Sequence, residues 1–144
     1  MAARRGVRLG VDVGSVRVGV ALSDADAILA TPLVTLTRGS SDLELLAELV
    51  REHAAVEVVV GLPRHLSGAE GAAAADATTY AVRLGALVAP VPVRLVDERL
   101  STVTAEQALR ARGIRGPRRR QVVDQAAAVV ILQSALDALG SDRA

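Results

Sequence analysis

The chain has 144 residues, 51% of them hydrophobic, and a formal net charge of +1, which excludes a disordered or strongly charged protein. It contains no cysteine and two histidines, which excludes disulfides, thiolate metal centres and His-rich zinc sites. No apolar run approaches the roughly 18 residues of a membrane span. We therefore expect one domain over residues 1–144, with frayed ends at 1–5 and 140–144, in a cytoplasmic protein with no membrane partner.

Three strands are predicted at the N-terminus, over about 7–13, 17–23 and 28–36. Their connections are short, which implies an antiparallel meander. Ser41 and Glu44 have the spacing of a capping box, so a helix should begin there. Apolar residues at helical spacing predict its buried face, made of Leu43, Leu46, Ala47 and Val50.

The second half of the chain alternates strands and helices. Strands are predicted at 58–61 and 93–97, and helices at about 68–88, 101–112 and 116–139. Ser67 and Glu70 form a second possible capping box, and the helix that follows should carry Tyr80, Leu84 and Leu87 on one side. Crossover connections make the last two strands parallel to the first. The predicted fold is α/β and ribonuclease H-like: a five-stranded mixed sheet of order 3-2-1-4-5 with helices on both faces.

Three acidic residues stand in apolar surroundings. Asp12 ends the first strand, Glu98 follows the last strand, and Asp124 interrupts an apolar helical stretch. An unpaired buried carboxylate costs several kcal/mol, so three inward carboxylates suggest a positive group between them. Mg²⁺ or Mn²⁺ fits an all-oxygen ligand set, and phosphoryl-transfer chemistry would follow.

Each acid also has a simpler explanation. Asp12-x-Gly14 occurs in hairpin turns for steric reasons, although Gly14 would also permit a positive φ and leave room for a phosphate. Glu98 can pair with Arg99 at the strand end, and Asp124 can form a buried salt bridge with an arginine. The residues alone leave these alternatives open.

The basic side chains, apart from the histidines, are all arginine, as genomic base composition would produce. Arg17 is a candidate for bidentate phosphate binding. The segment 110–120 carries arginines and no acid, so it is either a solvated loop or a contact for nucleic-acid backbone. We expect residues 111–120 to form a mobile flap. The candidate nucleic-acid contacts are Arg17, Arg99, Arg115, Arg118, Arg119 and Arg120.

Nearly the whole chain resembles one family. The motifs that carry the resemblance are Asp12-x-Gly-x-x-Arg17-x-Gly19, Val60-Gly61-Leu62-Pro63, Asp97-Glu98-Arg99-Leu100-Ser101-Thr102 and Asp124-x-x-Ala127-Ala128. Together they resemble the family of 16S rRNA precursor nucleases called YqgF or RuvX. The resemblance implies a metal-dependent nuclease in which Asp12, Glu98 and Asp124 bind Mg²⁺ or Mn²⁺ and catalyse hydrolysis. It further implies processing of the 5′ end of pre-16S rRNA.

Other functions stay open at this stage. A Holliday junction resolvase acting on branched DNA would favour a homodimer over a monomer, because two strands must be cut symmetrically. A non-catalytic nucleic-acid-binding module could retain the fold. A nucleotide-binding fragment of the actin and sugar-kinase ATPases has a similar Asp-x-Gly hairpin, but it needs a second domain.

Overall fold

The computed structural model describes residues 5–63, 68–97 and 116–143. Five strands form one mixed sheet in the predicted order β3-β2-β1-β4-β5. β1 pairs antiparallel with β2 and parallel with β4, which in turn pairs parallel with β5. The strands are β1 (Arg8–Val13), β2 (Arg17–Ser23), β3 (Ala30–Thr37), β4 (Glu57–Leu62) and β5 (Val93–Asp97).

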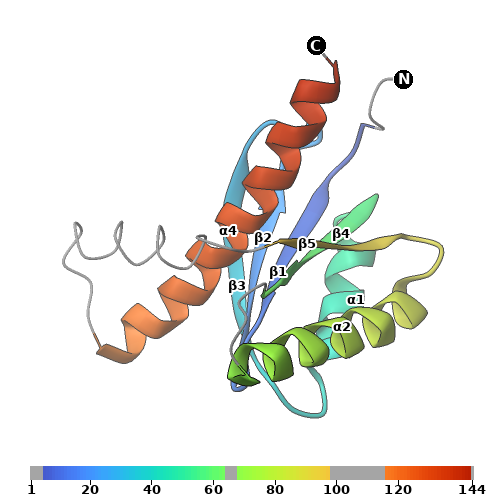
Figure 1. The fold of residues 1–144 in the computed structure, drawn as a ribbon. Helices are drawn as coiled ribbons and strands as arrows, with labels where there is room; N and C mark the ends of the chain where they lie inside the picture. Colours follow the sequence, from blue (N-terminus) through green and yellow to red (C-terminus); the bar gives the residue numbers. More distant parts are fainter. Residues whose placement is uncertain (1–4, 64–67, 98–115, 144) are drawn as a thin grey trace.

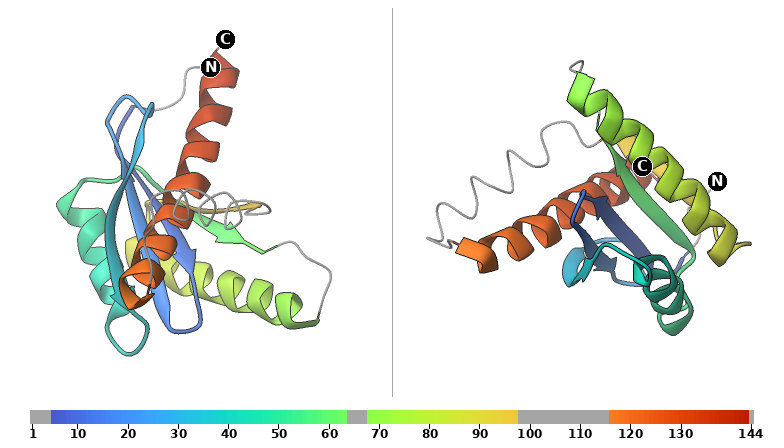
Figure 2. Two further views of the ribbon diagram at one scale, coloured as in Figure 1. Left: turned by 90° about the vertical axis from the view of Figure 1, so that its left-hand side faces the viewer. Right: turned by 90° about the horizontal axis from the view of Figure 1, so that it is seen from below.

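Helices cover both faces of this sheet (Figures 1 and 2). α1 (Asp42–Glu52) and α2 (Gly68–Val88) pack on one face, and α4 (Gly116–Arg143) packs on the other. The predicted helix over 101–112 lies outside the described residues. The described helices include none that is both long and apolar enough to span a bilayer.

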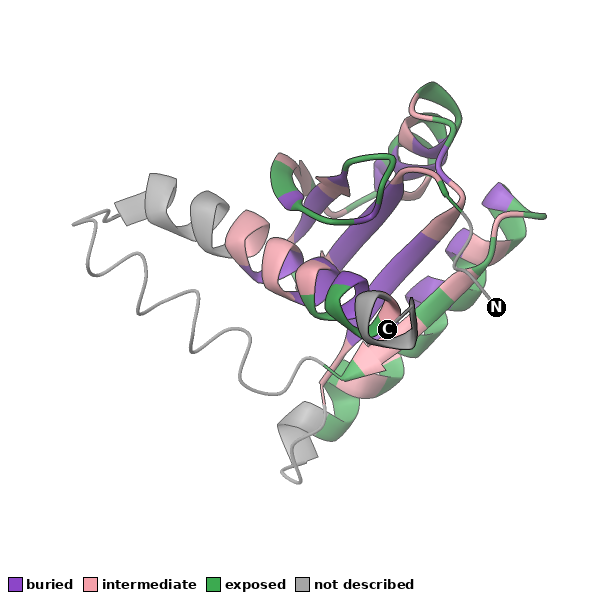
Figure 3. Cartoon of the chain, turned by 90° about the horizontal axis from the view of Figure 1, so that it is seen from above, coloured by how far each residue is buried: buried purple, intermediate pink, exposed green. Residues whose placement is uncertain are grey.

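Two aliphatic clusters hold the layers together, and Figure 3 shows the buried strands between the helices. The larger one joins Leu9 and Val11 of β1 to α1 and α2, and it includes Tyr80 as its one aromatic ring. The smaller one joins Val59 of β4 to Ala128 and Leu132 of α4. Successive residues of a strand point to opposite faces, so Gly10 and Asp12 lie on the α4 face when Leu9 and Val11 face α1 and α2.

The structure corrects several local predictions. Ser41 is the N-cap of α1, but its side chain forms no capping hydrogen bond. Asp42 is buried instead, and its carboxylate accepts hydrogen bonds from Gly39 N and Tyr80 Oη. Leu87, expected on the same side as the buried Tyr80 and Leu84, is 48% exposed and borders a hollow between the ends of α1 and α2.

Differences also occur at element ends. β3 begins at Ala30 rather than Ile28, because the carboxylate of Asp24 holds the backbone N–H groups of Ile28 and Leu29 in a turn. α4 continues past Leu139 to Arg143, and it begins at Gly116. Residues 116–120 are helical, as the predicted helix over 116–139 requires. The mobility expected of residues 111–120 stays a prediction, and residues 111–115 lie outside the described residues.

Candidate active site

Asp12 lies near the end of β1, at the edge of the sheet where the parallel strands finish. Its partner across the antiparallel β1–β2 ladder is Gly19. Directly opposite residues of such a pair project from the same face of the sheet, so Asp12 and Gly19 share the α4 face. Asp12 is half-buried.

Gly19 allows α4 to approach the sheet closely. A Cβ atom at Gly19 would lie 2.0 Å from the backbone oxygen of Asp124, and one at Gly10 would lie 2.6 Å from Leu132 Cβ. Any side chain at Gly19 would therefore displace the helix backbone. Because Gly19 is opposite Asp12, this contact places Asp124 beside the position that carries Asp12.

The side chain of Asp124 forms an ion pair with β2. Arg17 Nε donates to Asp124 Oδ2 at 2.8 Å, and the two side chains are 30% and 19% exposed. The arginine partner considered for Asp124 from the sequence is thus Arg17, itself a predicted site residue. The structure brings Asp12, Arg17 and Asp124 to one edge of the sheet, on the α4 face.

The turn between β1 and β2 explains Gly14. Gly14 N donates to Arg17 O at 2.9 Å, and a Cβ atom at Gly14 would lie 2.7 Å from the same oxygen. The positive φ considered for Gly14 is wrong, since Gly6 is the only described glycine with one. Gly14 is required for space, because the chain folds back against itself there.

Sequence reasoning missed two glutamines that fix α4 along β3. Gln125 Nε2 donates to Thr35 Oγ1 at 2.9 Å, next to Asp124. Farther along the helix, Gln133 accepts from Ala30 N at 2.9 Å and donates to Ile28 O at 2.8 Å. Their spacing of eight residues puts them on one side of α4, and this is the only sequence signal that could have indicated them.

Other predicted site residues are not placed by the structure. Glu98, Arg99 and Arg115 lie outside the described residues, and Arg118, Arg119 and Arg120 belong to the first turns of α4. In the ranges 5–63, 68–97 and 116–143, no three acidic or histidine side chains form a group that could hold a metal ion. The three-carboxylate metal site therefore stays a prediction.

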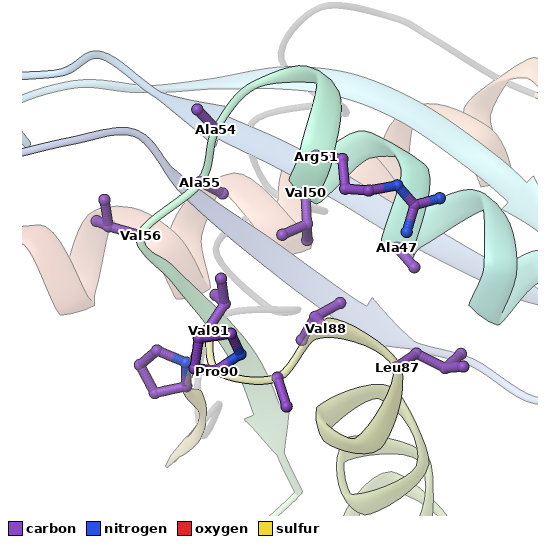
Figure 4. A pocket seen from close by; sticks show the side chains of 12 residues that line it. Ala47, Val50, Arg51, Ala54, Ala55, Val56, Leu87, Val88, Pro90 and Val91 are labelled. Carbon is purple, nitrogen blue, oxygen red and sulfur yellow. The ribbon is translucent and has the colours of Figure 1, made fainter.

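An apolar hollow of about 470 Å³ lies at the opposite end of the sheet (Figure 4). It is bounded by the ends of α1 and α2 and by the start of β4, with Val50, Val56, Leu87 and Pro90 among its lining residues. Neither Asp12 nor Asp124 lines it. The edge of the sheet that carries Asp12 and Asp124, called the acidic edge below, is thus separate from this hollow.

Comparison with known proteins agrees with this arrangement. A family model described as "RuvX: Holliday junction resolvase" matches residues 6–138. The chain belongs to the RuvX family. The expectations of this family and of a nuclease are thereby confirmed, while the choice of substrate is not.

Two curated relatives that match most of the chain carry the same name. A "Putative pre-16S rRNA nuclease" of Thermobifida fusca is 59% identical over 141 residues, covering 93% of this chain and 89% of the relative. A protein of the same name from Nocardioides sp. is 60% identical over 139 residues, with the same coverage of 93% and 89%. The chain thus matches these relatives over most of their length.

Solved structures confirm the ribonuclease H-like fold. RuvC of Thermus thermophilus in complex with a Holliday junction substrate superposes with a TM-score of 0.61 at 18% identity, covering 94% of this chain and 96% of RuvC. Fowlpox virus resolvase, in complex with Holliday junction DNA, superposes with a TM-score of 0.54 at 9% identity, covering 92% and 98%. At these identities the likeness concerns the fold alone.

Proposed function

We propose that this chain is a divalent-metal-dependent nuclease that processes the 5′ end of pre-16S rRNA in the cytoplasm. Asp12, Glu98 and Asp124 would be its metal-binding and catalytic acids. The observation that carries the proposal is the contact of Gly19 with the backbone of Asp124. It sets a carboxylate of α4 beside the cross-strand partner of Asp12.

The described residues of this edge suit a hard cation. Two carboxylates from different elements share it, and carboxylate oxygens are the ligands that Mg²⁺ and Mn²⁺ accept. A divalent ion bound there would activate water for attack on a phosphodiester and neutralise charge on the leaving oxygen. The ion pair with Arg17 holds Asp124 in place. Binding of a metal ion by this carboxylate would make Arg17 available to a phosphate.

The sheet order explains why the third acid would be a glutamate. β4 lies between β1 and β5, and adjacent strands are about 4.8 Å apart, so the backbones of β1 and β5 are roughly 10 Å apart. Glu98 follows β5 directly in the sequence and lies outside the described residues. We propose that its longer side chain supplies the reach that an aspartate would lack.

Arginines would contact the nucleic acid around these acids. Arg17 is the one whose position is described, and its two terminal nitrogens take no part in the bond from Nε to Asp124. Phosphate oxygens are natural acceptors for such nitrogens. Further contacts are proposed for Arg99 and for the arginines at and before the start of α4, which are Arg115, Arg118, Arg119 and Arg120.

The names of the relatives support an RNA substrate, and the description of the family model supports a second candidate, cleavage of four-way DNA junctions. The two candidates differ in assembly as well as substrate. Symmetric cleavage of a junction calls for a homodimer with two sites, whereas trimming an RNA end needs one site in a monomer.

The deciding experiment compares cleavage of a pre-16S rRNA fragment and a four-way DNA junction in Mg²⁺ and in Mn²⁺. We expect the wild-type protein to cut the RNA, and Asp12→Asn to lose at least about a hundredfold in rate. The matched control is Asp137→Asn, the same change at an exposed position of α4, which should keep wild-type activity.

Three results would overturn parts of the proposal. Cleavage of the junction alone would replace the RNA substrate with branched DNA. Metal-independent cleavage, or full activity in Asp12→Asn, would remove the acids from the mechanism. Binding of either nucleic acid without cleavage would leave a non-catalytic binding module.

A further inference from the structure

Arg38, which follows β3 directly, holds the turn between β1 and β2 from the face opposite to α4. Its backbone N–H donates to Val16 O at 2.8 Å, and its Nη1 donates to Gly14 O at 3.1 Å. Gly14 and Val16 are turn residues between Asp12 and Arg17. Arg38 therefore fixes two carbonyl groups in the turn that joins Asp12 to Arg17.

The guanidinium of Arg38 is itself fixed by α2. Nη1 and Nη2 donate to the two carboxylate oxygens of Asp76, with Nη2 at 2.8 Å from Oδ1. The guanidinium also lies 5.1 Å from the centroid of the Tyr80 ring. A two-point bond to a carboxylate sets the plane of an arginine as well as its position, and stacking on an aromatic ring adds to this.

Tyr80 extends the same network to α1. It is 2% exposed, and its hydroxyl donates to Asp42 Oδ2 at 2.7 Å. The other oxygen of Asp42 accepts from the backbone of Gly39, the residue after Arg38, at 3.0 Å. The side chain and the following backbone of Arg38 are thus both anchored to helices that do not contribute to the acidic edge.

The turn has room to move when this anchor is lost. A hollow of about 290 Å³ lies beside it, lined by Ser15, Arg38, Tyr80 and Arg83 among others. Arg38 makes its contacts across one side of this hollow. Without them, the described side chains leave open space next to the turn rather than a packed wall.

We propose that Arg38 is a positioning residue, which acts through the carbonyl groups of Gly14 and Val16 to hold Arg17 on Asp124. The inference rests on the proposed function, since the consequence for cleavage follows only if Asp12 and Asp124 form the nuclease site. Misplacing reacting groups by about 1 Å can cost on the order of a hundredfold in rate. The contacts of Arg38 described above run to the turn, to Asp76 and to Tyr80, so its effect would reach the acids through the turn.

The first test is spectroscopic and needs no substrate. In Arg38→Lys the charge stays, but an ammonium cannot reproduce the planar fork that bonds Asp76 and Gly14 together. We expect solvent exchange of the Arg17 Nε proton, measured by nitrogen-edited NMR, to speed up at least about threefold as the turn opens. The matched control is Arg94→Lys, which removes an exposed arginine paired with Glu57 elsewhere on the sheet and should leave this proton unchanged.

The second test is kinetic, on whichever nucleic acid the wild type cleaves. Arg38→Lys should lower kcat at least about tenfold with little change in KM, at a temperature well below its unfolding midpoint. Asp76→Asn should produce the same pattern more weakly, and it serves as a second variant if Arg38→Lys fails to fold.

The outcomes separate this inference from the function on which it rests. Unchanged exchange of the Arg17 proton in folded Arg38→Lys or Asp76→Asn overturns the positioning role, whatever the activity. Faster exchange supports it. If the wild type cleaves neither nucleic acid, the proposed function fails, and the NMR result alone still decides how Arg38 acts on the turn.

Discussion

Two arginine–aspartate pairs hold the same turn from opposite faces of the sheet, and they are built differently. Arg17 reaches Asp124 through one bond from Nε, while Arg38 bonds both oxygens of Asp76, the carbonyl of Gly14 and the face of Tyr80. The first pair engages one oxygen of its aspartate, and under the proposed function it would open when a metal ion binds the carboxylate or a phosphate binds the arginine. The second engages its guanidinium on several sides and serves as a fixed support.

The difference indicates where a separable ion pair is useful in this fold and where a fixed one is. A carboxylate that binds metal, as proposed for Asp124, cannot be tied permanently to an arginine, because the guanidinium and the metal ion compete for the same oxygens. A support behind the site has the opposite requirement. An arginine–aspartate pair serves each requirement. The pair on the α4 face has one bond, and the pair on the α2 face belongs to a network of bonds.

Disrupting the close contact between α4 and β2 should have the largest effect on cleavage and on stability. In Gly19→Ala the new methyl group would lie 2.0 Å from the backbone oxygen of Asp124, so α4 must move away from β2. We expect cleavage to be lost and the free energy of unfolding to fall by about 3 kcal/mol, at the upper end for overpacking. Urea denaturation and a cleavage assay measure the two effects.

Gly71→Ala is the matched control for this prediction. A Cβ atom at Gly71 meets nothing within 4 Å, and the residue lies in α2, where alanine favours the helix by roughly 0.5–1 kcal/mol. The control should therefore be slightly stabilised and fully active. Wild-type activity in Gly19→Ala would show that the close approach of α4 is not needed at the site.

Exchanging one aspartate of each pair should separate activity from stability. Asp124→Asn should lose metal-dependent cleavage by at least about a hundredfold, yet lower the free energy of unfolding by only about 0.5 kcal/mol, since the amide oxygen can still accept the one hydrogen bond from Arg17 Nε. Asp76→Asn should lower stability by about 1 kcal/mol, a value already reduced for screening because its side chain is 43% exposed. Its cleavage rate should fall only a few-fold.

Urea midpoints and initial cleavage rates on the two variants decide this point. If Asp124→Asn proved to be the more destabilised protein while retaining cleavage, the pair with Arg17 would be structural and the contrast between the two pairs would disappear.

The sequence predicted the framework well and these pairs poorly. Local patterns of apolar residues and turn residues marked β2 and β5 at their observed ends, and the order of elements led to the observed sheet. The acids were noticed because a charge in an apolar stretch is locally visible. Arg17 and Asp124 are 107 residues apart, and no local pattern indicates that they meet.

Asp42 is a second example of what local sequence patterns cannot predict. In the sequence it is an acid in the first turn of a helix, a position that usually faces solvent. In the structure it is 3% exposed, because Tyr80 from α2 supplies a hydroxyl to its carboxylate. A partner from a distant element reverses the local expectation for Asp42, while Ser41 is still the N-cap of α1 but without a side-chain hydrogen bond.

The smallest expected effect is the acid sensitivity of the support network. The hydrogen bond from Arg38 lowers the pKa of Asp76. Burial acts to raise the pKa of Asp42, but the bonds from Tyr80 and Gly39 outweigh it, so this pKa is lowered too. Folded-state pKa values below the unfolded value of about 3.9 mean that the stabilisation is present above that pH and is lost as the pH falls through the folded values.

Acidification from about pH 6 to about pH 3 should therefore lower the free energy of unfolding of the wild type, measured by urea denaturation, more than that of Asp76→Asn, by a few tenths of a kcal/mol after screening. The measurement isolates the α2 side of the turn, because Asp76 contacts Arg38 and takes no part in the pair with Arg17. An equal loss in both proteins would show that the bond between Arg38 and Asp76 contributes no stability, and the support behind the turn would then have to come from Tyr80 and Asp42 alone.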